Sequence, residues 1–397
     1  MQTYRWMTGV LAIAVLTGSV VASCQTGTES GSFTHTAQPD DLSVLAALPT
    51  TAPAPTDNPT TPEKVGLGRL LFFDPVLSGS KDVACATCHH PDFGYAEFLA
   101  VSIGVNGEGT GSSRHFRSPN DIPLVKRNAQ TILNVAFNGL TNQQPADPKR
   151  APMFWDLRAS SLENQALEPI RAFEEMRGHA FGGAVAADSV VARLRRIPDY
   201  NQRFRKAFGG TGPITVQQIA KAIAAYERTL VATNSRFDQY MRGDRAALSE
   251  SEQEGLQLFL KAGCANCHSG PMLSDFRLHT MGVADNETLP RTDAGPKSQY
   301  AFRTPSLRNL RYTAPYMHSG KLQTLQQVLE FYEDLSGGKI ANRHVLPRRL
   351  DPLIKNMNVE FRDINPLIEF LNTLNDDTFD RTIPKRVPSG LRVGGRL

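Results

Sequence analysis

The pattern Cys-x-x-Cys-His, present twice, constrains this chain more than any other feature. It occurs as CATCH, which starts at Cys85, and again as CANCH, which starts at Cys264. Two thiols at this spacing can add to the vinyl groups of one haem, and the adjacent histidine then falls beneath the iron as its proximal ligand. The sequence therefore predicts two covalently bound haems c, held by Cys85, Cys88 and His89 and by Cys264, Cys267 and His268.

Two other kinds of site also use the Cys-x-x-Cys pair, namely structural zinc sites and redox dithiols. Structural zinc pairs normally lie about 15–20 residues apart, far closer than these two motifs. A redox dithiol has no need of a following histidine in both copies. Because the chain has only 5 cysteines and 9 histidines, two chance copies of the full pattern are not expected.

Residues 1–23 have the pattern of an export signal, with Arg5 before the apolar stretch WMTGVLAIAVLTGSVV. The junction Val21-Ala22-Ser23-Cys24 resembles a bacterial lipobox, and the alternative is a lone cysteine beside an ordinary cleavage site. We expect a periplasmic or cell-envelope lipoprotein of a Gram-negative bacterium, tethered to the membrane only through a lipid on Cys24. The net charge of +4, without a Lys/Arg run, gives no sign of nucleic acid binding.

The composition changes along the chain. Residues 24–62 are rich in Thr, Pro, Ala and Ser, which predicts a disordered spacer. From residue 63 onward the apolar residues recur at helical intervals and strand signals are sparse. We therefore expect a mainly α fold with two cytochrome c-like haem domains, long ordered loops and few strands. The clearest helices are expected over 158–169, 187–196, 216–241, 249–260, 322–333 and 364–374.

An internal echo divides this region. The pattern Gly-x-x-Leu-Phe precedes each haem motif, beginning at Gly68 before the first and at Gly255 before the second. This echo predicts two related domains, over 63–240 and 241–383. Residues 384–397 are basic and rich in Gly and Pro, and we expect a mobile tail there.

Five blocks around these motifs resemble the bacterial di-haem cytochrome c peroxidase family, and its MauG-like branch in particular. The resemblance covers residues 67–375, nearly all of the chain beyond the spacer. The blocks are LGRLLFFDPVLS with CATCHH (67–90), RNAQTILNVAFNG (127–139), MFWDLRASSLENQALEPI with EEM (153–176), GCANCHSGPMLSD (263–275) and TPSLRNLRYTAPYMHSGKLQTLQQVLEFY (304–332).

The resemblance implies a peroxide site at the first haem. The family places Gln, Pro and Glu over that haem, at spacings matched by Gln165, Pro169 and Glu175, which makes Glu175 the acid/base; the alternative is a solvated carboxylate at a helix end. Ordinary members cap this iron with a loop histidine, but the matching stretch SIGVNGEGTG (102–111) contains none. His115 lies further along, either as a shifted cap or as an exposed loop residue.

At the second haem the resemblance distinguishes the branches. Ordinary peroxidases use a methionine as the sixth ligand, whereas the MauG-like branch uses a tyrosine, which Tyr332 matches. Tyr332 could instead be a core aromatic residue with Met317 as the ligand. Trp155 matches the family residue between the haems, where an indole can relay electrons, and core packing is the alternative. A calcium ion between the haems would be bound by Asn128, Thr313 and Pro315.

The resemblance as a whole implies an enzyme that uses hydrogen peroxide at an open haem to form a high-valent state shared by two haems. That state would oxidise an aromatic residue, Trp or Tyr, of a partner protein. MauG has a surface tryptophan two residues before the second motif, where this chain has Ala262, which argues against an identical electron exit to the same substrate. The extended loop over 102–126 and the lipobox resemble instead the MauG-like di-haem proteins of methanobactin and copper systems. Three other functions stay open: an ordinary peroxidase using electrons from a small cytochrome c or cupredoxin, a non-catalytic electron carrier, and a zinc-binding lipoprotein.

Overall fold

Helix boundaries follow the capping residues of the sequence. The computed structural model describes residues 41–396. In it, helix α1 (Pro62–Phe73) begins after Thr61, whose hydroxyl accepts a hydrogen bond from the Lys64 amide. Helix α9 (Glu250–Lys261) begins after Ser249, which forms a capping box with Glu252. A serine or threonine at these positions satisfies amide groups that the first helical turn leaves unpaired.

The described chain is mainly helical, as predicted. Its strands are two short antiparallel pairs, β1 (Gly107–Glu108) with β2 (His115–Phe116) and β3 (Leu278–His279) with β4 (Phe302–Arg303). The remaining helices are α2 (Cys85–Cys88), α3 (Leu162–Gln165), α4 (Glu168–Arg171), α5 (Ala186–Arg195), α6 (Pro198–Phe208), α7 (Val216–Glu227), α8 (Arg236–Met241), α10 (Leu325–Ser336) and α11 (Ile364–Asn372).

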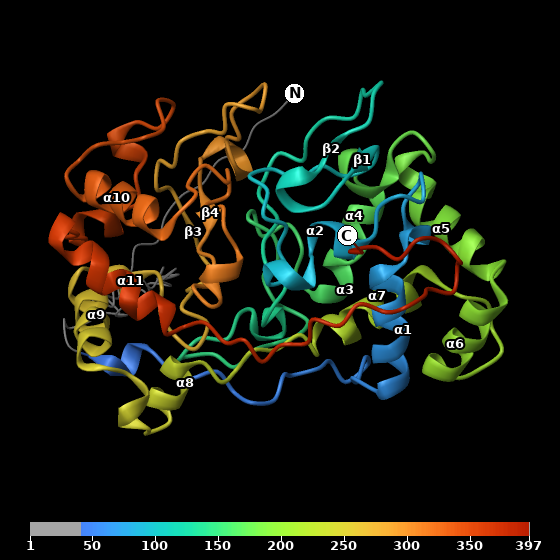
Figure 1. The fold of residues 1–397 in the computed structure, drawn as a ribbon, viewed down its shortest axis with the longest axis horizontal. Coiled ribbons are helices and arrows are strands. Elements are labelled where there is room, and N and C mark those ends of the chain that lie inside the picture. The colour runs from blue at the N-terminus through green and yellow to red at the C-terminus, as the bar shows by residue number, and fades with distance from the viewer. Residues whose placement is uncertain (1–40, 397) are drawn as a thin grey trace, which may run out of the picture. The chain divides into compact units, whose positions relative to one another are not determined.

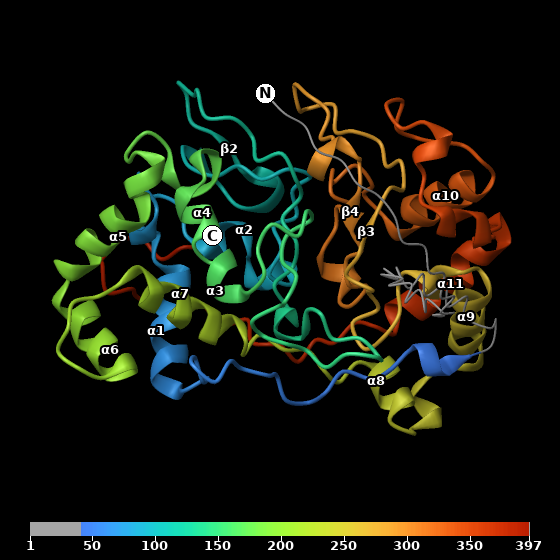
Figure 2. The ribbon, with the colours of Figure 1, turned by 180° about the vertical axis from the view of Figure 1, so that it is seen from behind.

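Two groups of helices surround the two cysteine motifs. We call α1–α7 the first lobe and α8–α11 the second lobe; the strands β3 and β4 lie between them in both views (Figures 1 and 2). The described residues of both lobes belong to a single compact unit. Each lobe has its own buried apolar clusters, centred on α1 and α7 in the first and on α9 and α11 in the second.

The glycine that begins each Gly-x-x-Leu-Phe pattern lies at a close crossing of two helices in its lobe. In the first lobe α1 crosses α7 at Gly68, where a Cβ atom would lie 1.8 Å from the carbonyl oxygen of Ala222. In the second lobe α9 crosses α11 at Gly255, where a Cβ atom would lie 2.1 Å from the carbonyl oxygen of Pro366. Only glycine permits helices to approach this closely, which explains why both copies of the pattern begin with it.

Most expected helices form with shifts of one to three residues at their ends, and two of them are broken. The expected helix over 216–241 stops at Glu227 and restarts as α8 at Arg236, because Ser235 caps a new helix. The expected helix over 158–169 is two short helices, α3 and α4, separated at residues 166–167. Helix α10 starts at Leu325 rather than 322, after the capping residue Thr324.

Contrary to the expected disordered spacer, residues 41–61 are packed against both lobes. Leu45 belongs to the apolar cluster of the second lobe, and the Leu48 amide donates to the buried carboxylate of Asp238 at 2.8 Å. Asn58 reaches the first lobe, where its amide donates to Glu163 at 2.8 Å. The segment is rich in Thr, Pro, Ala and Ser, but its leucines bury enough apolar surface to order it. The expected signal 1–23 and Cys24 lie outside the described residues.

Contrary to the expected mobile tail, residues 384–396 cover the first haem motif. The Gly394 amide donates to the carbonyl of Phe73 at 2.8 Å, and a ring nitrogen of His90 donates to the carbonyl of Gly395 at 2.7 Å. Val387 and Val393 are buried in the apolar cluster of the first lobe. The glycines lie against small residues of CATCH, so low side-chain volume here signals close packing rather than mobility.

Among residues 41–396, no helix combines the length and apolar character needed to cross a bilayer.

Candidate haem sites

The first motif presents a histidine oriented for metal binding. Helix α2 carries Cys85 and Cys88, and the Nδ1 atom of His89 lies 3.1 Å from the Tyr95 carbonyl. Because a carbonyl only accepts, Nδ1 carries the proton and Nε2 keeps the lone pair that a metal needs. Burial lowers the pKa of His89 and so favours this neutral form, while burial raises the pKa of the Cys85 thiol to about 12.

The second motif repeats this arrangement. His268 Nδ1 lies 3.0 Å from the Leu273 carbonyl, and burial lowers the pKa of the imidazole. Burial also raises the pKa of the Cys264 thiol to about 12. Both histidines therefore keep Nε2 free to bind a metal, on two motifs, CATCH and CANCH, that differ at a single position.

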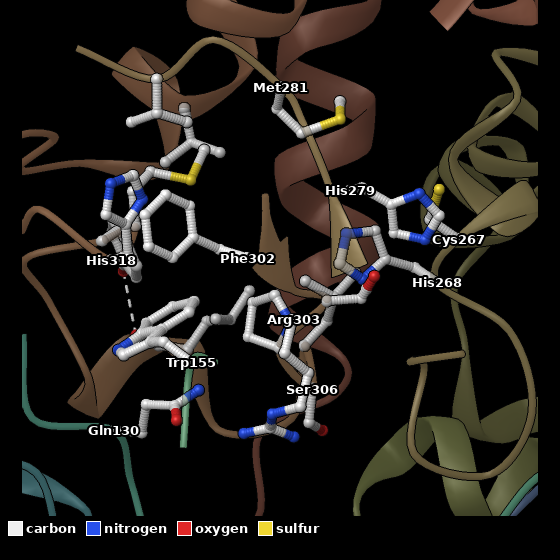
Figure 3. Close-up of a pocket in the computed structure, with 18 of the residues that line it drawn as sticks. Gln130, Trp155, Cys267, His268, His279, Met281, Phe302, Arg303, Ser306 and His318 are labelled. Atoms are coloured by element: carbon white, nitrogen blue, oxygen red, sulfur yellow. Dashed lines mark hydrogen bonds between the residues drawn. The ribbon is translucent and has the colours of Figure 1, made fainter. Parts of the chain in front are cut away.

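The second motif opens into a large cavity with mostly apolar walls. Cys264, Cys267 and His268 lie on its wall, and Trp155 lines it as well. In Figure 3, Cys267, His268 and His279 stand on one side and Trp155, Phe302 and His318 on the other. Two thiols and a neutral histidine facing an apolar cavity fit a covalently attached haem, whose flat macrocycle is itself apolar.

The structure brings both candidate ligands of the second site into this cavity. Tyr332 reaches it from α10, and Met317 reaches it from the loop before that helix. Burial raises the pKa of the Tyr332 phenol above its ordinary value. Met281, which follows β3, also lines the cavity and was not singled out from the sequence, because an isolated methionine in a loop carries no motif.

Trp155 lies in an aromatic cluster beside the same cavity. Its indole nitrogen donates to the Asn128 carbonyl at 3.0 Å, and its ring lies 6.3 Å from that of His318. The His318 ring stacks on Phe302 at 3.5 Å between centroids. Burial lowers the pKa of His318 to about 3, so this imidazole is neutral. Sequence reasoning found Trp155 but missed His318 and Phe302.

The three residues expected to bind calcium all line this cavity. The Asn128 amide nitrogen donates to the Leu99 carbonyl at 2.8 Å, which leaves its side-chain oxygen as an acceptor. Thr313 and Pro315 lie on the same wall. Oxygen atoms of this kind are the ligands that calcium prefers.

The residues expected over the first haem come from three consecutive elements. Gln165 ends α3, Pro169 lies in the first turn of α4, and Glu175 lies in a π-helical turn, Phe173–Arg177, that packs against α4. Burial, reinforced by the negative charge of Glu174, raises the pKa of Glu175 to about 7. A carboxyl group with this pKa can both accept and return a proton near neutral pH.

The loop 102–111 holds the backbone of Glu175. The Val105 amide donates to the Glu175 carbonyl at 3.0 Å, and a Cβ atom on Gly104 would lie 2.3 Å from that same oxygen. The stretch that matches the histidine-bearing loop of ordinary family members therefore holds the backbone of Glu175 in this chain.

Comparison with known proteins identifies the family. The model of a family described as di-haem cytochrome c peroxidase matches residues 62–246. The chain is 37% identical over 393 residues to the methylamine utilization protein MauG of Methylorubrum extorquens, covering 96% of this chain and 99% of that protein. This chain belongs to the di-haem cytochrome c peroxidase family. It is therefore an oxidoreductase, and the two haems of the family account for its two motifs.

Two further relatives broaden the comparison. The chain is 32% identical to cytochrome c551 peroxidase of Nitrosomonas europaea, over 87% of this chain and 90% of that protein. A solved structure described as a MauG-like protein associated with microbial copper homeostasis matches with a TM-score of 0.67 and 28% identity, covering 83% of this chain and 95% of its own. The family thus includes relatives named as MauG and relatives named as peroxidases at similar identity.

The structure also places His115 and Ala262, two positions considered in the sequence analysis. His115 lies on the surface strand β2, where its Nε2 atom is 3.1 Å from a carboxylate oxygen of Glu108, so it forms an exposed hydrogen-bonded contact. Ala262, which follows α9, is 4% exposed and does not reach the surface.

Several buried ionisable residues near the motifs were missed by sequence reasoning. Burial raises the pKa of Glu97, which lies beside Cys88, to about 7. Near the second motif, His279 is bonded to both Asp275 (2.8 Å) and Asp351 (2.7 Å). Burial opposes charging of His279, but these two carboxylates raise its pKa to about 12. Both ring nitrogens thus have carboxylate partners, and the ligand atoms of Asp275, His279 and Cys267 lie within 4.8 Å of one another.

Proposed function

We propose that this chain is a MauG-like di-haem c oxidoreductase, which uses hydrogen peroxide to oxidise a tryptophan or tyrosine of a partner protein. The observation that carries the proposal is Tyr332, which lines the same cavity as His268. A tyrosine in place of the methionine of ordinary peroxidases favours higher oxidation states of iron. The absence of a histidine from 102–111, and the outward position of His115, support an open first site.

Each motif residue has a stated role in this proposal. Cys85 and Cys88 would hold the first haem and Cys264 and Cys267 the second, with His89 and His268 as the histidine ligands of the two irons. When bound, the haems supply an iron that reacts with peroxide and a second centre that shares the two oxidising equivalents. The protein supplies neutral imidazoles, apolar walls that limit water, and separate environments for the two centres.

Proton movement at the first site falls to Glu175. With a pKa of about 7, its ionised form accepts the proton from the bound peroxide and returns it to the departing oxygen. Gln165 offers an amide that can orient the peroxide, and Pro169 presents a side chain that cannot ligate iron. This arrangement would leave the iron of the first haem accessible to peroxide.

Trp155 is proposed as the relay between the two centres. It lines the second cavity, and its indole hydrogen bond to Asn128 fixes the ring orientation. A calcium ion held by Asn128, Thr313 and Pro315 would rigidify the same region. We also propose one haem domain on each side, over 63–240 and 241–383, in a cell-envelope protein anchored through Cys24; the repeated glycine crossings support the duplication.

An ordinary di-haem cytochrome c peroxidase is the second candidate. It is favoured by the two methionines, Met281 and Met317, that line the second cavity and could replace Tyr332 as ligand. Its electrons would come from a small cytochrome c or cupredoxin. The similarity to cytochrome c551 peroxidase of Nitrosomonas europaea supports this candidate as well.

Stopped-flow absorbance distinguishes the two candidates. Hydrogen peroxide is added to the fully oxidised holoprotein, with detection extended into the near infrared. A rapid, long-lived change that includes a near-infrared band is expected for the MauG-like enzyme. If the protein reacts only after one electron is supplied, the ordinary peroxidase is correct. A His115→Ala variant is the control. Because His115 is exposed on β2, its removal should leave the rate and the spectrum of the reaction with peroxide unchanged.

A further inference from the structure

Tyr300 connects the second haem cavity to the protein surface. It is half-buried and lines the cavity, and its ring stacks on that of His344, with centroids 6.4 Å apart and planes within 9°. His344 lies on an exposed loop. One tyrosine therefore borders both the cavity and an aromatic contact at the surface.

The turn that carries Tyr300 is held in an unusual conformation. Lys297, Ser298 and Tyr300 all have positive φ angles, of 51°, 55° and 56°. Residues other than glycine rarely adopt this conformation, so a turn with three of them persists only where its surroundings fix it. Arg349 supplies one restraint, since its guanidinium donates to the Ser298 carbonyl at 3.4 Å. The position of the Tyr300 ring is thus imposed by the fold.

The loop that contacts this turn is strongly basic. Residues 339–355, which we call the basic loop, contain five Lys and Arg residues, of which Lys339 is paired with Asp334 at 2.8 Å. The loop has a single acidic residue, Asp351, whose charge is paired with His279. Arg343, Arg348 and Arg349 are exposed, and Leu346 between them is 44% exposed. A rim of positive charge around an exposed apolar residue is the composition of a surface that binds a protein with an acidic face.

The basic loop also forms the outer wall of the second haem cavity. Asn342 and Val345, which alternate with its exposed residues, line that cavity. The Asn342 amide donates to the Val283 carbonyl at 2.9 Å and anchors the loop. A partner seated on the basic loop would therefore lie one layer of protein away from the second cavity.

We propose that Tyr300 is the relay through which oxidising equivalents leave the second haem site, and that the basic loop docks a partner protein with carboxylates around its oxidisable aromatic residue. This inference rests on the proposed function and adds the exit residue and the charge of the partner. The position two residues before the second motif cannot serve as the exit, because Ala262 is buried and carries no redox-active group.

Electrons and protons balance in the transfer through Tyr300. Tyr300 gives one electron to the second haem site and releases its phenolic proton to the surrounding water, and it then regains an electron from the aromatic ring of the partner and a proton from water. Two such transfers remove two electrons from the partner. Together with two protons, these electrons reduce one hydrogen peroxide to two water molecules, so the oxidant is fully accounted for.

Docking is tested by binding, without peroxide. The probe is a fluorescent peptide with one tryptophan between aspartates, and its counterpart carries lysines in their place. The holoprotein should bind the acidic peptide. The triple variant Arg343→Glu, Arg348→Glu, Arg349→Glu should bind it with an affinity lower by about tenfold or more. Arg205→Glu on α6, exposed on the first lobe, is the matched control and should bind like wild type. Equal binding by the triple variant, with unchanged circular dichroism, overturns the docking surface.

The relay is tested by peptide oxidation. With peroxide and saturating acidic peptide, Tyr300→Phe should lower tryptophan oxidation by about tenfold or more, whereas Tyr300→Trp, which keeps an oxidisable ring, should retain most of it. Tyr312→Phe is the control, because Tyr312 is half-buried but does not line the cavity. The initial reaction of peroxide with the holoprotein should be the same in all variants.

Mass spectrometry supplies a readout independent of turnover. Without peptide, peroxide should leave an oxidised Tyr300 in the wild type and spare Tyr312. Wild-type peptide oxidation by Tyr300→Phe would refute the relay while leaving the proposed function intact. A wild-type protein that reacts with peroxide but oxidises no aromatic peptide would refute both.

Discussion

The helix crossing at Gly68 permits a stability test with an internal control. In Gly68→Ala the new Cβ atom would lie 1.8 Å from the Ala222 carbonyl oxygen, so α1 and α7 must separate by about 1.2 Å to reach even a 3.0 Å contact. Overpacking of this severity costs about 3 kcal/mol or more, and alanine returns about 1 kcal/mol of helix propensity. We therefore expect a net loss of about 2 kcal/mol or more in the free energy of unfolding.

Gly66→Ala is the matched control in the same helix. Gly66 is exposed and a Cβ atom there would have no neighbour within 4 Å, so the substitution should raise the stability by about 0.5–1 kcal/mol. Thermal unfolding of the two holoproteins, followed by far-ultraviolet circular dichroism, should give melting temperatures that move in opposite directions. Gly255→Ala in α9 should also lower the melting temperature, because its Cβ atom would lie 2.1 Å from the Pro366 carbonyl oxygen. If Gly68→Ala melts no lower than Gly66→Ala, the crossing does not require glycine.

Four further predictions concern the sites and the stability of the fold. The rate of reaction with peroxide should rise with pH through about 7 as Glu175 ionises, and Glu175→Gln should lower it by about 10²–10⁴-fold and abolish this pH dependence. Glu174→Gln should keep the activity but move the midpoint to lower pH, because it removes the charge that raises the pKa of Glu175; an unmoved midpoint contradicts this coupling. Tyr332→Phe should change the absorption and electron paramagnetic resonance spectra of the second haem while Met317→Leu does not, and the reverse result would make the methionine the ligand. Asp238→Asn, which breaks a buried ion pair, should lower the free energy of unfolding measured in urea by about 3–5 kcal/mol, and a loss below about 1 kcal/mol would contradict this.

Local patterns in the sequence were sufficient for the motifs and for most helices. The spacing of cysteines and histidine is set by covalent chemistry, and Thr61 and Ser249 mark their helices through hydrogen bonds a few residues long. The capped restart at Ser235 uses the same kind of signal, yet the apolar periodicity of 216–241 continues across it, so periodicity alone predicted one helix instead of two.

The remaining features depend on contacts between distant parts of the chain. Nothing near His318 in the sequence indicates that its ring stacks on Phe302, and His279 meets Asp351 only after the second lobe has folded. The stacking of Tyr300 on His344 is of the same kind. Composition misled at both ends, because Pro, Thr and Gly are common in disordered segments and also in extended segments that pack closely on a surface.

The cover over the first haem motif has a consequence for the order of assembly. Gly395, which bonds to His90, is synthesised about 300 residues after Cys85. While the second lobe is still being made, no part of this cover exists, and both cysteines of the first motif stay open to the machinery that attaches haem. The first motif to be synthesised therefore belongs to the last pocket to close, which gives the slow covalent step the longest interval in which to finish.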